Sequence, residues 1–165
     1  MRILAIDPGC DKSAYVIWDT DNQVILHKGK VANDELLHVL TSPSLYDTVV
    51  IEMIASYGMA VGKEVFETCI WIGKYTQVAQ YEGAEVRRVL RQPIKLHHCN
   101  SNKANDSNVR AALIDKYGSP GTKKSPNPVY NDHTVKMAAD IWAAFALATY
   151  CSESREPKYF QFFHN

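Results

Sequence analysis

The sequence predicts a single α/β domain whose sheet has mixed strand directions. Of its 165 residues, 46% are hydrophobic and 22% are charged, which is typical of one globular domain and excludes a disordered tail, a collagen-like fibre and a coiled-coil rod. Short apolar runs typical of strands alternate with longer segments of helical periodicity. The expected order of elements is βββαβαβ, followed by helices.

Apolar runs bounded by turn residues define the expected strands. The first run stops at Asp7-Pro8-Gly9, a turn sequence, and the first three runs follow one another as in an antiparallel meander. The fourth run is apolar until its last residue, Glu52. The expected strands are residues 3–6, 13–18, 24–27, 48–52 and 84–90.

Capping residues and helical spacing define the expected helices. Asn33 or Asp34 can cap the first, and a loop around Gly58 leads into a long second helix. The final helix is almost wholly apolar, so we expect it to be buried. The expected helices are residues 33–40, 61–81, 103–117 and 133–150.

Charge is unevenly distributed, although Lys plus Arg and Asp plus Glu both number 18. Residues 85–136 contain ten basic and four acidic side chains, a net charge of +6, so the remainder of the chain carries −6. A basic segment of this kind can form a phosphate-binding face. The alternative interpretation is a set of ordinary solvated faces.

The cysteines and the apolar runs indicate a cellular compartment. Cys10, Cys69, Cys99 and Cys151 show no CxxC pattern, and the first residues do not resemble an export signal. No apolar run reaches the roughly 18 residues that a membrane span requires. We therefore expect a cytoplasmic protein with reduced thiols and no membrane association.

Three carboxylates occupy positions typical of a metal site. Asp7 and Glu52 each end an apolar strand, and sites in open α/β sheets gather at the carboxyl ends of strands. Asp140 is the only charged residue between Met137 and Ser152, and a carboxylate on a buried helix needs a partner. Carboxylates from separate elements fit Mg²⁺ or Mn²⁺ and metal-dependent phosphodiester hydrolysis. The alternatives for Asp140 are a narrow solvent stripe or an ion pair with a nearby arginine.

Motifs along nearly the whole chain form an ordered set. They are Ile6-Asp7-Pro8-Gly9 with Ser13-Ala14-Tyr15, the strand ending in Glu52, residues 103–107 running into 109–113, residues 121–124, residues 127–130, and Asp140-Ile141-Trp142-Ala143-Ala144. The set resembles RuvC-type Holliday-junction endonucleases of the ribonuclease H-like superfamily, and phage-encoded ones most closely. The resemblance implies a ribonuclease H-like five-stranded mixed sheet flanked by helices, with residues 1–150 as the nuclease domain.

The resemblance also implies the metal ligands. Asp7, Glu52 and Asp140 match the family's metal-binding, catalytic carboxylates, and the implied cofactor is Mg²⁺, for which Mn²⁺ can substitute. The family's fourth ligand lies one turn before the last one, where this chain has Met137 and Lys136. The pattern is therefore broken at that position.

Residues near this break are candidates for the missing role. His133 precedes Asp140 by seven residues, so it would share a helical face with that carboxylate. Asp132 can act as the fourth metal ligand, but it is equally suited to cap the helix. Lys136 can instead contact the scissile phosphate.

The implied partners are branched DNA, especially four-way junctions, and a second copy of the chain. Basic residues would hold phosphates, and an aromatic residue after Glu52 would stack on an unpaired base. These nucleic-acid-binding candidates are Tyr57, Arg91, Lys95, Lys103, Arg110, Lys123 and Lys124. Surplus apolar residues on the long helix form a candidate dimer surface or belong to a helix buried on two sides: Phe66, Ile70, Trp71 and Tyr75.

The expected function is that of a Mg²⁺-dependent, structure-selective endonuclease. It would resolve four-way or other branched DNA by paired nicks in recombination and repair, encoded by a phage or prophage and acting in the host cell. Two alternatives keep the fold: ribonuclease H-type cleavage of RNA–DNA hybrid or structured RNA, and a junction-binding module with a degenerate site. Actin-like and sugar-kinase ATPases open with a similar turn, but they need a duplicated domain that 165 residues do not accommodate.

Residues 151–165 form an aromatic C-terminal tail. Tyr159, Phe160, Phe162 and Phe163 place four aromatic side chains within five positions. We expect this tail to dock on the domain or on a partner, because so many aromatic groups are costly to leave in water.

Overall fold

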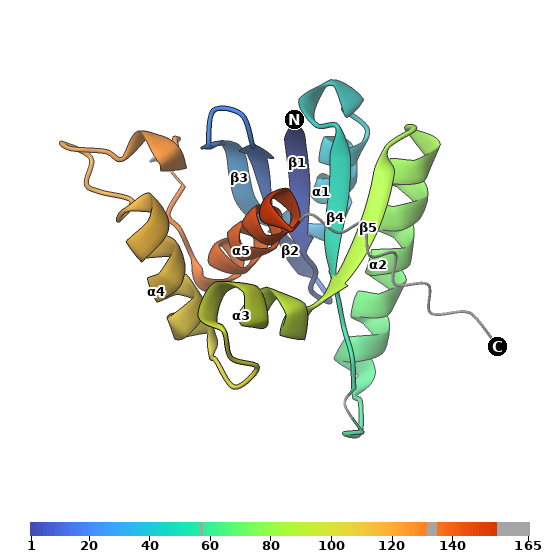
Figure 1. The fold of residues 1–165 in the computed structure, drawn as a ribbon. Helices are drawn as coiled ribbons and strands as arrows, with labels where there is room; N and C mark the ends of the chain where they lie inside the picture. The colour runs from blue at the N-terminus through green and yellow to red at the C-terminus, as the bar shows by residue number, and fades with distance from the viewer. Residues whose placement is uncertain (57, 132–134, 155–165) are drawn as a thin grey trace.

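The computed structural model describes residues 1–56, 58–131 and 135–154, and one five-stranded sheet runs through it (Figure 1). The strand order is β3-β2-β1-β4-β5; β1 pairs antiparallel with β2 and parallel with β4, β2 pairs antiparallel with β3, and β4 pairs parallel with β5. The expected mixed sheet is confirmed. The strands are β1 (Arg2–Asp7), β2 (Lys12–Asp19), β3 (Val24–Ala32), β4 (Thr48–Met53) and β5 (Glu85–Leu90).

Helices cover both faces of this sheet. Helices α1 and α2 pack on one face, and α3, α4 and α5 lie on the other (Figure 1). The helices are α1 (Asn33–Leu40), α2 (Lys63–Tyr81), α3 (Arg91–Cys99), α4 (Asp106–Tyr117) and α5 (Ala139–Glu153), with short 3-10 turns at Pro43–Leu45 and Pro128–Tyr130. No helix in the described part of the chain has both the length and the apolar character to span a membrane.

Strand alternation divides the core into two layers. In β1, Ile3 and Ala5 belong to the cluster that packs against α5, whereas Leu4 and Ile6 belong to the cluster against α1 and α2. All four are at most 1% exposed, because β1 is central and both of its faces are covered. Every odd-numbered residue of β1, Asp7 included, therefore points to the α5 side.

Glu153, at the end of α5, joins the three helices on its face. Its carboxylate accepts a hydrogen bond from the Tyr117 hydroxyl (2.8 Å) and contacts Lys116 Nζ (2.6 Å) and His97 Nε2 (3.0 Å). Burial alone would raise the pKa of Glu153, but these three contacts lower it below its usual value.

Two helical predictions need correction. Helix α3 was not predicted, since residues 91–99 read as a basic connection after the fifth strand. Helix α5 begins at Ala139 and not at residue 133, because Val135 to Ala138 are non-helical and Ala138 is extended (φ −69°, ψ 166°). This start places the Asp140 carboxylate in the first helical turn, where the helix dipole favours negative charge.

Candidate functional site

The pairing of β1 with β4 brings two of the predicted carboxylates to one place. Ile6 pairs with Ile51 in parallel register, so Asp7 and Glu52 are the next residues of adjacent strands. Val50 packs in the same cluster as α5, and alternation then places Glu52 on that face as well. Both side chains therefore lie at the carboxyl ends of their strands, on the side of the sheet that α5 covers.

Buried hydrogen bonds hold the turn that follows Asp7. The Ser13 hydroxyl donates to Asn33 Oδ1 (2.7 Å), accepts from the Gly9 amide (3.2 Å) and lies 3.0 Å from the Tyr75 hydroxyl. Asn33 Nδ2 donates back to the Gly9 carbonyl (2.9 Å). A Cβ atom at Gly9 would lie 2.4 Å from the Lys12 carbonyl oxygen, so this turn requires glycine.

Asp140 reaches the same face from α5 and meets a lysine from β3. Asp7 is opposite Ala14 on β2, and Ala14 is opposite Lys30 on β3, so Lys30 shares a row and a face with Asp7. The Lys30 ammonium group forms an ion pair with the Asp140 carboxylate. Both side chains are substantially exposed, at 45% and 41%, so this pair is accessible to water and ions.

Glu52 also has a basic partner. Arg91, the first residue of α3, donates to Glu52 Oε2 (2.8 Å) and, through its other terminal nitrogen, to Asp106 Oδ1 (2.5 Å). The side chains of Arg91 and Glu52 are only 20% and 16% exposed. Arg91 therefore links the carboxylate on β4 to the first turn of α4.

The electrostatic environment of Asp7 is unfavourable to its charge. Burial, followed by the charge of Glu52 and opposed by Arg91, raises the pKa of Asp7 to about 7, and Asp140 adds to the rise. Burial also raises the pKa of Glu52, although Arg91 opposes the change. A cluster of partly buried carboxylates with raised pKa values is a feature of functional sites and of cation sites before the cation binds.

The oxygen atoms of these carboxylates are suitable ligands for a divalent cation, but the three side chains are not close enough together to bind one ion. A cavity of about 550 Å³ opens beside them, lined by Asp7, Lys30, Asp140 and the turn at residues 8–12. Within the described residues, no three His, Cys, Asp or Glu side chains are grouped closely enough to hold one ion. Mg²⁺ and Mn²⁺ prefer oxygen ligands, which the carboxylates of Asp7, Glu52 and Asp140 provide. Two of these carboxylates are ion-paired, Asp140 with Lys30 and Glu52 with Arg91.

The basic residues predicted to bind nucleic acid differ in their exposure. Lys95 is half-buried on α3, while Lys103, Arg110, Lys123, Lys124 and Lys136 are exposed. Arg110 lies over the Trp142 ring, with its guanidinium carbon 5.3 Å from the ring centroid.

Three of the predicted residues, Tyr57, Asp132 and His133, lie outside the described part of the chain. The argument that placed His133 on the helical face of Asp140 is wrong, since α5 starts only at Ala139. Asp132 likewise is not the residue that caps α5, because the N-cap position belongs to Ala138.

Two residues of the site were missed from the sequence, Lys30 and Asp106. Lys30 falls in the second half of β3, which extends to Ala32 and not to residue 27 as expected. The register of the first three strands would have placed it in the row of Asp7. Asp106 directly follows Asn105, whose side chain caps α4, and the capping pattern was a usable signal for a helix start there.

Comparison with known proteins identifies the architecture. No protein-family model and no curated protein sequence matches the chain. Among solved structures, Thermus thermophilus RuvC superposes with a TM-score of 0.68 at 14% identity, covering 91% of this chain and 92% of that one. The chain has the RuvC fold.

Two further structures with the RuvC fold agree with this assignment. T. thermophilus RuvC in complex with a Holliday junction substrate gives a TM-score of 0.64 at 15% identity, over 91% of this chain and 92% of that chain. The yeast mitochondrial Holliday junction resolvase Ydc2 gives 0.62 at 10% identity, over 92% and 78%. The expected ribonuclease H-like sheet is thus confirmed, and Asp7 and Glu52 lie where its strands β1 and β4 end, on the face that α5 covers.

Proposed function

We propose that this protein is a metal-dependent endonuclease that resolves four-way DNA junctions. The observation that carries the proposal is that Asp7 and Glu52 lie side by side at the carboxyl ends of β1 and β4, with Asp140 of α5 near enough to raise the pKa of Asp7, on a chain with the RuvC fold. Two proteins with the same fold support the choice of substrate, since one was solved with a Holliday junction and another is a Holliday junction resolvase. Cleavage by paired nicks follows from the symmetry of such a substrate.

The three carboxylates would hold Mg²⁺, with Mn²⁺ as a substitute. When bound, the ion supplies Lewis acidity that activates a water molecule and stabilises the leaving oxygen of a phosphodiester. Asp7 contributes a carboxylate whose proton is held up to about pH 7, so ligand competence increases above that pH. In the absence of the metal, Lys30 forms an ion pair with Asp140 and Arg91 forms one with Glu52. Both ion pairs would have to open for the carboxylates to bind the metal.

Exposed basic side chains would bind the phosphates around this site. Lys103 precedes α4, Arg110 lies on α4, and Lys123 and Lys124 lie in the loop that follows it, on the same side of the sheet as α5. Lys136 lies four residues before Asp140 and can reach a phosphate near the carboxylates. Each phosphate contact releases counterions and therefore steepens the salt dependence of binding.

A homodimer is the assembly that we propose, with α2 at its interface. Phe66 and Ile70 lie one helical turn apart and are 60% and 53% exposed, so they form an apolar surface on α2. Trp71 is half-buried beside them. Tyr75 is fully buried and bonded to Ser13, so it belongs to the core and not to the candidate dimer surface.

The second candidate function is junction binding without cleavage, because two of the three carboxylates are ion-paired with basic side chains. A junction-binding module would keep Lys30 and Arg91 in place and never assemble a metal site. A labelled four-way junction, a linear duplex and an RNA–DNA hybrid, each with Mg²⁺, Mn²⁺ or chelator, separate the candidates. Paired, metal-dependent nicks in opposite arms that disappear in Asp7→Asn support the nuclease. Tight binding without cuts supports the binding module, and cuts in the hybrid alone move the substrate to RNA.

A further inference from the structure

Strand β5 is the least covered strand of the sheet. It lies at the edge and none of its six residues is buried, whereas four residues of the neighbouring β4 are. Helix α5 packs mainly on β1 and β2, and α3 covers only the end of β5. The face of β5 on the α5 side is therefore left open.

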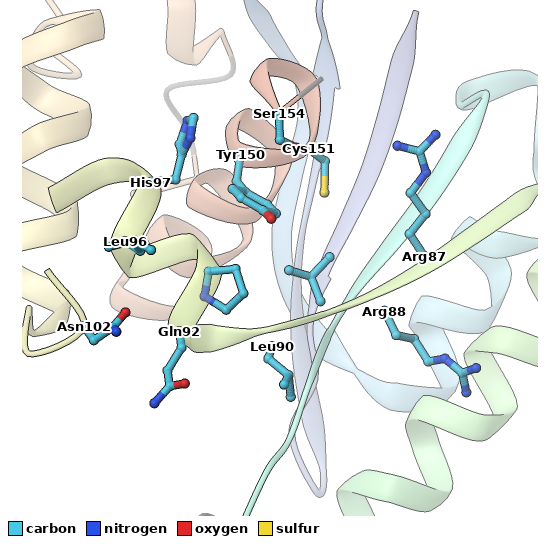
Figure 2. Close-up of a pocket in the computed structure, with 12 residues that line it drawn as sticks. Arg87, Arg88, Leu90, Gln92, Leu96, His97, Asn102, Tyr150, Cys151 and Ser154 are labelled. Carbon is cyan, nitrogen blue, oxygen red and sulfur yellow. The ribbon is translucent and has the colours of Figure 1, made fainter. Parts of the chain in front are cut away.

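A pocket of about 530 Å³ occupies this open face, between β5, α3 and the end of α5 (Figure 2). Figure 2 shows Tyr150 and Cys151 on the side of α5 that faces β5, with Leu96 and His97 on α3 at the opposite wall. Val89 contributes an apolar floor. Burial raises the pKa of the Cys151 thiol to about 12, which is consistent with a pocket that is apolar at its inner end.

The chain continues from the wall of this pocket into its most aromatic segment. Ser154 lines the pocket and is the last described residue. Residues 155–165 follow it, and Tyr159 is the fifth residue after Ser154. Five residues can span up to roughly 17 Å when extended, which is long enough for the aromatic segment to turn back onto the pocket that Ser154 lines.

We propose that the aromatic segment 159–163 docks in the pocket between β5, α3 and α5 of its own chain. The chemistry of the two surfaces matches, because four aromatic side chains meet an apolar pocket and would otherwise remain in water. Arg87 lines the pocket, and its guanidinium, which is ion-paired with Glu85 (2.7 Å), suits the face of an aromatic ring. This docking would cover the face of β5 that α5 leaves open. The proposal does not depend on nuclease activity.

The test is a thermal double-mutant cycle on the full chain. Leu96 is 50% exposed in the described residues, so Leu96→Glu costs little unless another group packs on it. We expect Leu96→Glu and the tail variant Phe160→Ser/Phe162→Ser/Phe163→Ser each to lower Tm by roughly 3–6 °C. The combined variant should lose no more than either one alone, because both remove the same contact.

A matched control uses an exposed apolar residue away from the pocket. Met59 is 71% exposed and does not line the pocket, so Met59→Glu should add independently to the tail variant. Strict additivity of Leu96→Glu with the tail variant, or no effect of either, would overturn the proposal.

Hydrogen exchange identifies which chain supplies the segment. The tail variant should increase exchange in residues 85–97 by about tenfold, equally at low and high protein concentration. Protection that grows with protein concentration would instead assign the segment to a second copy and overturn docking within one chain.

Discussion

Replacing Asp7 with asparagine should make the metal-free protein more stable at pH 8. Asp7 has a pKa of about 7 in the fold against 3.8 for a free side chain, because it is buried beside Glu52 and Asp140. The folded state therefore binds the proton more tightly than the unfolded state, and stability falls as pH rises from about 4 to about 7. At about 1.4 kcal/mol per pKa unit the loss has an upper limit of roughly 4 kcal/mol.

About half of that limit is a realistic expectation, since penetrating water offsets part of the cost of burying the charge. Asp7→Asn removes the charge and keeps the shape, so it should recover about 2 kcal/mol at pH 8. For a chain of this length that corresponds to a Tm increase of roughly 4–8 °C. At pH 4 the variant and the wild type should melt together.

Calorimetric melting in chelator from pH 4 to pH 9 measures this difference. Mg²⁺ should then raise the Tm of the wild type but not that of the variant, because binding to the folded state alone is stabilising. Asp11→Asn is the matched control: Asp11 is exposed and lines the same cavity, so its replacement should leave the melting curves unchanged. A wild type and Asp7→Asn whose Tm difference is the same at pH 4 and pH 8 would refute the electrostatic reasoning.

Four more outcomes are expected. Glu153→Gln should destabilise the fold by about 1–2 kcal/mol at pH 7 in urea titrations, and the deficit should disappear as the pH falls through the lowered pKa of Glu153, since its contacts stabilise only the charged carboxylate. Gly9→Ala should lower Tm by several degrees and reduce cleavage, because its Cβ would overlap the Lys12 carbonyl. Lys30→Met should tighten Mg²⁺ binding about fivefold in calorimetry by removing the cation that competes for its carboxylate partner. Lys123→Ala/Lys124→Ala should reduce the salt slope of junction binding by about 2, without changing the Tm.

Local patterns were sufficient to predict four of the five strands and the carboxylates near the ends of β1 and β4, whereas β3 was predicted too short. The apolar runs that stop at Asp7 and Glu52 indicate where β1 and β4 end, and therefore which end of the sheet carries the two carboxylates. The meander of the first three strands was predictable because short connections favour pairing of successive strands.

Features that depend on tertiary contacts were not predictable. Helix α3 is nine residues long, contains Pro93 and has only one buried residue, Ile94, so its apolar face is too small to mark a helix in the sequence. The start of α5 was predicted too early because Val135 and Met137 continue the apolar character of the helix without belonging to it. The pairing of Lys30 with the α5 carboxylate joins residues that are 110 positions apart, and no local pattern encodes it.

The hydrogen bond between Tyr75 and Ser13 connects α2 to the turn beside the Asp7 carboxylate. Tyr75 lies on the inner side of α2, and the exposed Phe66 and Ile70 lie on the same helix. A displacement of α2 along its axis would move the hydroxyl that supports the turn after Asp7. In the homodimer proposed above, association through α2 would therefore adjust the turn after Asp7 in both subunits at once, a means of synchronising the two proposed cuts.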